Sequence, residues 1–147
     1  MKRAWVRAWL LIAAILAASI APPASAAVRI ANDSGGKIGP YLDNFAMMRQ
    51  TGQRVIIDGL CLSACTMVLG IVPRERICVT GRARLGFHAA WLPDAAGRPK
   101  LSTAGTKALW DIYPVEVRNW LVKHGGLKPK MVYLHGTELA AMYPTCR

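Results

Sequence analysis

A β-branched run that is followed by a segment of small residues constrains the fold of this chain most. Residues 54–57 have the composition of a buried strand, and residues 63–71 have the small and apolar side chains of a helix. Gly59 lies between them, and we expect it to end the strand. Shorter strand-like and helix-like segments alternate on either side of this unit. The order predicts an α/β domain with parallel strand pairing.

The other expected elements follow from local residue patterns. Apolar residues fall at helical spacing over 38–50, and Pro114 suits the first turn of a helix that runs to His124. The segment 91–106 is rich in Pro, Gly and Ala, which favours a loop. Further strands are expected at 28–30, 76–80 and 84–88.

The first 26 residues have the pattern of an export signal. Three basic residues precede an apolar run from 9 to 21, and two prolines follow it. This run is too short for a membrane-spanning helix, which takes roughly 20 residues. With Ala-Ser-Ala at 24–26, the pattern predicts a cleaved signal peptide over 1–26 and a bacterial protein that is periplasmic or secreted. The alternative is an uncleaved N-terminal anchor.

Cleavage after Ala26 leaves one domain over 27–147. The loss of Lys2, Arg3 and Arg7 lowers the formal net charge from +11 to +8. A hydrophobic fraction of 53% excludes an intrinsically disordered chain. Positive charge on an exported protein favours an anionic envelope surface or an acidic partner over nucleic acid. The basic residues are scattered, so a generally basic, solvated surface explains them equally well.

All four cysteines lie in this domain: Cys61, Cys65, Cys78 and Cys146. An even number in an exported chain predicts two disulfides, with three pairings open. Cysteines and histidines do not show the spacing of zinc ligands, so no metal is expected. No cofactor is expected either, because the turn at 34–36 lacks the spacing of a phosphate loop and the Ser/Thr that follows its lysine.

Ser63 and His88 are the candidate reactive residues. Ser63 lies where the buried strand passes into the helix, near free backbone N–H groups, which suits a nucleophile whose product is an oxyanion. Serine is also a preferred helix N-cap, and this is the structural alternative. His88 ends the strand 84–88, where it can act as general base or serve a purely structural role.

Together, Ser34-Gly35-Gly36, the Gly59-x-x-x-Ser63 turn and His88 resemble the Clp protease proteolytic subunit and the wider crotonase-like fold. That family has a Ser-x-Gly-Gly type turn, a Gly-x-Ala-x-Ser nucleophile turn and a histidine further along. The interval from Ser63 to His88, 25 residues, matches the family's spacing. The resemblance covers 28–90 well and 131–146 loosely. Within the family, the chain most resembles small exported bacterial Clp-like proteins that have a Cys-x-Ser-Ala-Cys nucleophile turn.

The resemblance implies a crotonase-like, Clp protease-like parallel sheet flanked by helices. It also implies a serine hydrolase that acts by acyl transfer on a peptide or another acyl substrate. Ser63 would attack the acyl carbon, and His88 would take up and return its proton. The backbone N–H groups of Gly36 and Ala64 would hold the oxyanion.

Two departures favour a second interpretation. The family register places the triad aspartate near residues 144–146, where no carboxylate is present. The third triad member is therefore unknown: Asp111 and Glu138 are weak candidates, and Asp58 is a poor one because it precedes the turn. The domain would also be N-terminally truncated, with a sheet edge that a partner or a homo-oligomer covers. The alternative function is a non-catalytic envelope binding protein of the same fold.

The resemblance also bears on the disulfides. Cys61 and Cys65 flank the nucleophile turn, and Cys146 falls where the family has its aspartate. Any pairing would tie this turn or the last residues to the sheet. We prefer Cys65 with Cys78, which leaves Cys61 for Cys146.

Overall fold

A computed structural model describes residues 26–147, so the predicted signal peptide lies outside the described residues except for Ala26. The described part is a mixed α/β domain with a five-stranded sheet, a separate hairpin and two disulfides. No helix within 26–147 has the length and apolar character needed to cross a membrane. In chain order the elements are β1 (Ala27–Asp33), α2 (Ile38–Gln50), β2 (Arg54–Leu62), the 3₁₀ helix η1 (Ser63–Met67), α3 (Val68–Ile71), the 3₁₀ helix η2 (Arg74–Arg76), β3 (Ile77–Val79), β4 (Arg84–Phe87), β5 (Trp91–Pro93), β6 (Pro99–Leu101), α4 (Thr103–Ile112), α5 (Val115–Lys123), β7 (Val132–His135) and α6 (Gly136–Met142).

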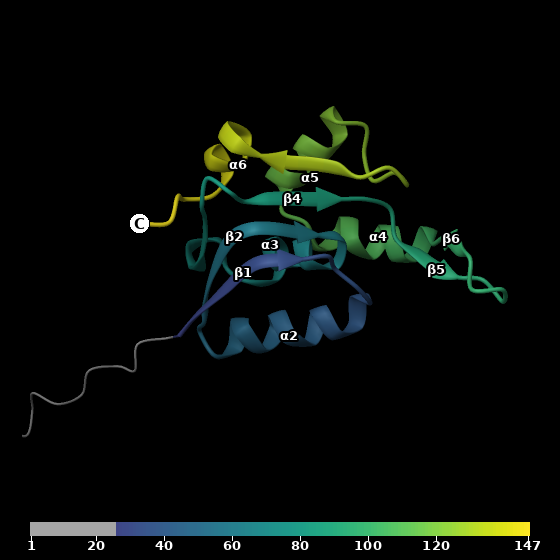
Figure 1. Ribbon diagram of the computed structural model, residues 1–147, viewed down its shortest axis with the longest axis horizontal. Helices are drawn as coiled ribbons and strands as arrows, with labels where there is room; N and C mark the ends of the chain where they lie inside the picture. Colours follow the sequence, from purple (N-terminus) through teal and green to yellow (C-terminus); the bar gives the residue numbers. More distant parts are fainter. Residues whose placement is uncertain (1–25) are drawn as a thin grey trace, which may run out of the picture.

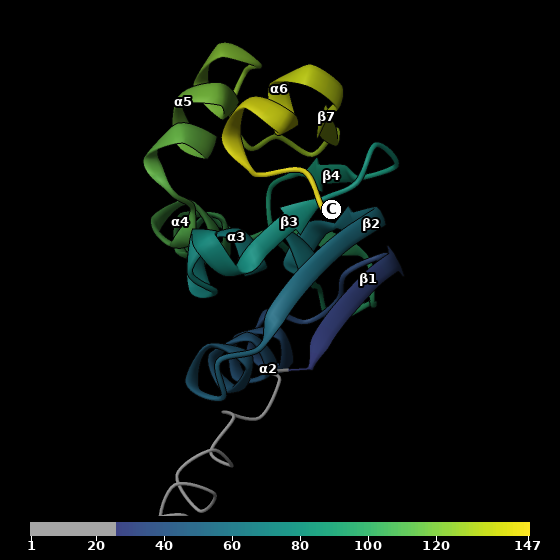
Figure 2. The same ribbon diagram turned by 90° about the vertical axis from the view of Figure 1, so that its left-hand side faces the viewer.

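The main sheet is rich in parallel pairs but is not wholly parallel. Its strands follow the order β1-β2-β4-β7, with β7 as the yellow arrow in Figure 1. Strand β3 also pairs with β2 (Figure 2). Strand β2 is parallel to β1, β3 and β4, as the sequence predicts. Strand β7 is antiparallel to β4, which corrects that prediction. The chain enters β7 with Val132 opposite Phe87, at the end where β4 stops, and therefore runs back along it.

Helices α2, α3, α4 and α5 lie on the same side of this sheet (Figure 2). The core forms between the two layers, from Ile57 and Leu85 in the sheet and Phe45, Val117 and Leu121 in the helices. The predicted helix at 38–50 is confirmed as α2. The helix predicted over 114–124 is α5, with Pro114 as its N-cap. The helix predicted over 63–71 begins with the 3₁₀ turns of η1 before α3.

Strand β2 continues past Gly59 to Leu62, so the expectation that Gly59 ends the strand is wrong. A Cβ at this glycine would lie 1.9 Å from the carbonyl oxygen of Ala31 on β1. The two strands also shift register between Ile30 and Asn32. Gly59 therefore permits a close backbone approach inside the sheet rather than a turn.

The segment 91–106, predicted as a loop, contains the hairpin β5–β6 and the first turn of α4. The Oδ1 atom of Asp94 accepts hydrogen bonds from the N–H groups of Ala96 and Arg98, which closes the hairpin turn. Ser102 caps α4 by accepting a hydrogen bond from the N–H of Gly105 at 3.0 Å. Side-chain hydrogen bonds thus order a segment whose composition suggested a loop.

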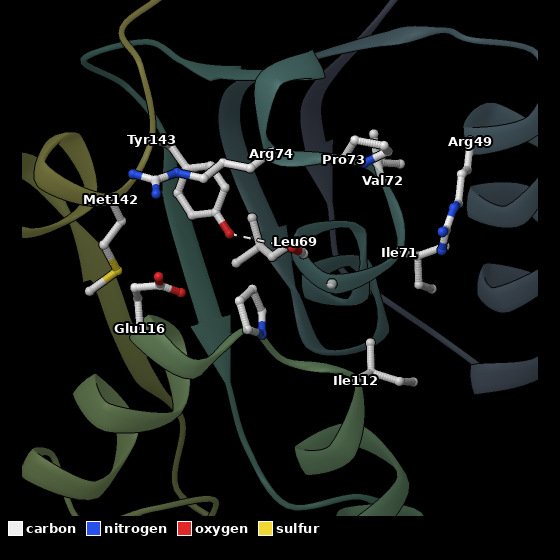
Figure 3. Close-up of a pocket in the computed structure, with 12 residues that line it drawn as sticks. Arg49, Leu69, Ile71, Val72, Pro73, Arg74, Ile112, Glu116, Met142 and Tyr143 are labelled. Carbon is white, nitrogen blue, oxygen red and sulfur yellow. Dashed lines mark hydrogen bonds between the residues drawn. The ribbon is translucent and has the colours of Figure 1, made fainter.

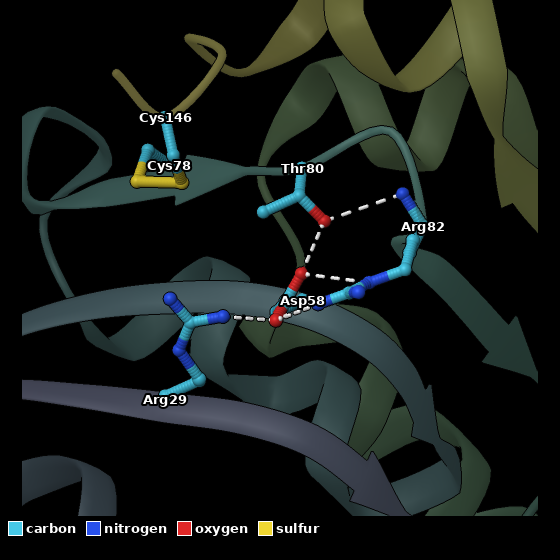
Figure 4. Close-up of polar contacts among 6 residues, drawn as sticks. All are labelled: Arg29, Asp58, Cys78, Thr80, Arg82 and Cys146. Carbon is cyan, nitrogen blue, oxygen red and sulfur yellow. Dashed lines mark hydrogen bonds and ion pairs between the residues drawn. A yellow bond between two sulfur atoms is a disulfide. The ribbon is translucent and has the colours of Figure 1, made fainter.

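Both disulfides form, but the preferred pairing of Cys65 with Cys78 and of Cys61 with Cys146 is wrong. Cys61 is joined to Cys65 across the turn after β2, with Cα atoms 5.3 Å apart. Cys78 on β3 is joined to Cys146, with Cα atoms 5.0 Å apart (Figure 4). A parallel bridge between β3 and the last residues of the chain brings this second pair together.

Candidate active site

The strand ends bring Ser63 and His88 together. Strands β2 and β4 are parallel neighbours with Leu62 opposite Gly86, so the residues that follow them emerge at the same edge of the sheet. Polar groups at this edge converge in open parallel sheets. The Oγ atom of Ser63 lies 2.8 Å from the Nε2 atom of His88, and both side chains are half-buried.

The backbone at Ser63 has an unusual conformation. Its φ of 55° is the only positive φ of a non-glycine residue among residues 26–147. L-residues rarely adopt this region, and such outliers gather at functional sites. Leu62, not Ser63, is the N-cap of η1, and the Ser63 hydroxyl contacts His88. The N-cap interpretation of Ser63 is therefore wrong.

The other ring nitrogen of His88 faces the backbone. Its Nδ1 atom lies 2.7 Å from the carbonyl oxygen of Ala89. Because a carbonyl oxygen only accepts hydrogen bonds, the hydrogen of the neutral ring resides on Nδ1. The Nε2 atom then has a free lone pair and accepts the hydroxyl hydrogen of Ser63.

The turn at 34–36 lies against the Ser63 turn. A Cβ on Gly35 would be 2.6 Å from the Cβ of Ser63 and 3.1 Å from the backbone nitrogen of Ala64. The same turn is fixed from its other side by Asp33, whose Oδ1 accepts the N–H of Gly35 at 2.8 Å and the hydroxyl of Tyr41 at 2.5 Å. Burial, followed by the hydrogen bond to Asp33, raises the pKa of Tyr41 to about 12.

The carboxylate candidates lie elsewhere. Asp111 pairs with Lys107 one turn away on α4, at 2.6 Å. Glu138 lies 3.7 Å from the Nε2 atom of His124. Among residues 26–147, no carboxylate forms a hydrogen bond or ion pair with His88. The Ala89 carbonyl occupies the position where a triad aspartate would orient the ring.

Asp58 is committed to a structural cluster within the sheet. Its buried carboxylate accepts hydrogen bonds from Thr80 at 2.7 Å, from Arg82 at 2.5 and 3.2 Å, and from Arg29 (Figure 4). The guanidinium of Arg82, followed by the Thr80 hydroxyl, lowers the pKa of Asp58 to about 2. The cluster joins β1, β2 and the loop that precedes β4, away from His88.

Sequence reasoning missed three groups at this site: the Ala89 carbonyl, Asp33 and Tyr41. Asp33 had a usable signal, because Asp-Ser-Gly is a common Asx-turn sequence whose carboxylate accepts the N–H two residues on. Tyr41 lies one helical turn inside α2, and no motif in the sequence marks its hydroxyl. Every residue has a backbone carbonyl, so no signal marks the one at Ala89.

Of two cavities, one lies next to the Ser63–His88 pair and the other does not. One, of about 470 Å³, is bordered by Ala89, Leu101, Trp110 and Leu127, and so adjoins the residue that orients His88. The other, of about 370 Å³, lies between α3, α5 and α6 and includes neither Ser63 nor His88 (Figure 3). In Figure 3 the Tyr143 hydroxyl donates to the Leu69 carbonyl at 3.4 Å.

No group of three His, Cys, Asp or Glu side chains within 26–147 is arranged to hold a metal ion.

Comparison with solved structures finds chains with a distantly similar path. The chain is similar to a solved structure of a ClpP1 mutant from Listeria monocytogenes, with a TM-score of 0.46 and 14% sequence identity. The match covers 81% of this chain and 71% of that chain. The chain matches no protein-family model and no curated protein sequence.

Proposed function

We propose that this chain is a serine hydrolase that acts by acyl transfer on a peptide or another acyl substrate. The observation that carries the proposal is the hydrogen bond of 2.8 Å between the Ser63 Oγ atom and the His88 Nε2 atom. The left-handed backbone at Ser63 supports it, because a turn of this kind aims the hydroxyl out of the sheet edge.

In the proposed reaction, His88 accepts the hydroxyl proton as the Ser63 oxygen attacks the acyl carbon. The protonated ring then returns this proton to the leaving group, and water repeats the sequence to release the acid. The Ala89 carbonyl keeps Nδ1 protonated throughout and so maintains the tautomer that the first step needs.

The oxyanion would be held by the backbone N–H groups of Gly36 and Ala64. Ala64 is the second residue of η1, so its N–H precedes the first hydrogen bond of that helix. The contact of Gly35 with the Ser63–Ala64 peptide supports a common oxyanion site. One such donor is typically worth a factor of about 10² to 10³ in rate.

A neutral carbonyl behind His88 stabilises the developing imidazolium less than a carboxylate does. In serine proteases, disabling the aspartate lowers turnover by roughly 10⁴. We therefore propose a slow enzyme. The same observation favours the second candidate function, a non-catalytic binding protein that retains the fold.

Export to an oxidising compartment belongs to this proposal. Two disulfides in a domain of this size are typical of periplasmic and secreted proteins.

A fluorophosphonate probe, which labels activated serines, separates the two functions. We expect the oxidised protein to be labelled at Ser63 and the label to disappear in Ser63→Ala and fall strongly in His88→Gln. His135→Gln is the matched control, because His135 is exposed and lies outside the site. Absence of labelling between pH 6 and 9 would favour the binding protein.

A further inference from the structure

The Cys61–Cys65 disulfide encloses the candidate nucleophile. It joins the end of β2 to η1 with a sequence separation of only 4, and Ser63 lies midway between the two cysteines. Both cysteines are fully buried in the core. The second disulfide, Cys78–Cys146, spans a separation of 68 and does not include the turn.

The two disulfides therefore have different main effects: one restricts the unfolded chain, and the other restricts a local turn. Loop-closure entropy grows with loop length, so the long-range bond restricts the unfolded chain far more than the short one. A bond across four residues acts chiefly on the local conformation of those residues. Here the enclosed residues are Leu62, Ser63 and Ala64, which carry the proposed nucleophile and one oxyanion donor.

Ser63 needs such a constraint. A φ of 55° is unfavourable for a serine, because its Cβ approaches the backbone in the left-handed region. Strained residues persist only where their surroundings over-determine the conformation. The Thr66 hydroxyl contributes by donating to the Ser63 carbonyl at 2.6 Å, and Gly35 packs on the other side.

We infer that the Cys61–Cys65 disulfide positions Ser63 for its hydrogen bond with His88, a role that rests on the proposed function of this pair. Cys61 and Cys65 are positioning residues and contact no substrate. The bond holds the strand end and η1 at a fixed separation. It thereby removes the extended and right-handed conformations of Ser63 that would turn Oγ away from Nε2.

The test compares Cys61→Ala/Cys65→Ala with the wild-type protein, and Cys78→Ala/Cys146→Ala is the matched control. The first readout is the ¹⁵N chemical shift of His88 Nε2, which senses the hydrogen bond and needs no activity. Ser63→Ala supplies the shift of the unpaired ring. We expect the ¹⁵N shift in the Cys61/Cys65 variant to lie more than halfway from the wild-type value to the Ser63→Ala value. The shift in the control should equal that of the wild type.

The second readout is the fluorophosphonate labelling rate at saturating probe. Displacement of a reacting group by about 1 Å can cost 10²-fold in rate, so we expect a loss of about 10-fold or more. A wild-type ¹⁵N shift in the Cys61/Cys65 variant overturns the positioning role. So does a wild-type rate in a protein that labels. An unlabelled wild-type protein whose His88 shift still depends on this disulfide refutes the proposed function alone.

A further variant covers the case in which the alanine pair does not fold. Cys61→Val/Cys65→Ala restores apolar volume in the core without restoring the bond. If this variant folds, its His88 shift decides the question as above. If both variants are unfolded while Cys78→Ala/Cys146→Ala is folded, the bond is required for the fold as a whole and the positioning role is overturned.

Discussion

Gly35 and Ser63 are in direct contact across two separate turns. A Cβ on Gly35 would lie 2.6 Å from the Cβ of Ser63 and 2.4 Å from the carbonyl oxygen of Leu62. Gly35 also has a φ of 79°, a conformation that glycine adopts without steric cost. The turn after β1 and the turn after β2 therefore form one unit that only glycine at this position permits.

We expect Gly35→Ala to slow fluorophosphonate labelling of Ser63 by about 10-fold or more, because the new methyl group displaces the Ser63 turn. Gly97→Ala is a matched control. Gly97 has a φ of 77°, and nothing lies within 4 Å of an added Cβ, so this variant carries the backbone strain alone. Equal labelling rates in the two variants would show that the contact with Ser63 does not matter.

Tyr41→Phe removes the hydroxyl that donates to Asp33 behind the turn at 34–36. We expect the free energy of unfolding in urea to fall by about 1 kcal/mol, the usual value of one hydrogen bond. The rate of fluorophosphonate labelling should also fall, because the Asp33 carboxylate that accepts the Gly35 N–H then loses the hydrogen bond from Tyr41. Tyr133→Phe is the control, since Tyr133 is 47% exposed. A larger effect at Tyr133 than at Tyr41 would contradict this account.

The Asp58 cluster predicts a loss of stability in acid. The pKa of Asp58 is about 2 in the folded protein and 3.8 without these contacts, so the folded state favours the ionised form. Its contribution is fully present above pH 5 and is lost as the pH falls through about 4 towards 2. The free energy of unfolding of Asp58→Asn should therefore depend less on pH in this range than that of the wild type. Parallel curves for the two proteins would refute the prediction.

The two disulfides should contribute unequally to stability. In the chain-entropy model, a separation of 68 is worth roughly 4 kcal/mol and a separation of 4 roughly 2 kcal/mol. Urea unfolding of Cys78→Ala/Cys146→Ala should thus show the greater loss. Equal losses, or a greater loss for Cys61→Ala/Cys65→Ala, would mean that contacts in the native state dominate over loop closure.

Local patterns predicted the elements whose conformation is set locally. The periodicity of 38–50 gives α2 its bounds, and the β-branched run at 54–57 contains Val55 and Ile57, which are fully buried in β2. The hairpin β5–β6 was missed because Pro93 and Pro99 stand opposite each other in it. Proline normally argues against a strand, but it is tolerated at the end of an exposed hairpin.

The candidate site could be predicted in part. Ser63 and His88 were expected together from the spacing of motifs, and the structure brings them together. The group behind His88 was not predictable, since it is a backbone carbonyl. The disulfide pairing depends on tertiary neighbours: Cys146 reaches Cys78 only because the last residues bridge to β3. Nothing within the sequence near Cys146 encodes that bridge.

Because β7 is antiparallel to β4, the loop before β7 reaches the site from a different direction than Ser63 and His88 do. The reactive pair follows two parallel strands, whereas the loop that leads into β7 reaches the same sheet edge from outside. Met131 in that loop packs on Gly86 beside Leu62, the residue that precedes Ser63. In the proposed enzyme, substitutions of side chains within 125–131 would change which acyl groups enter, while the pairing of β2 with β4 that aligns Ser63 and His88 stays the same. The proposed function thus assigns the choice of acyl group to this loop and the reaction with Ser63 to the ends of β2 and β4.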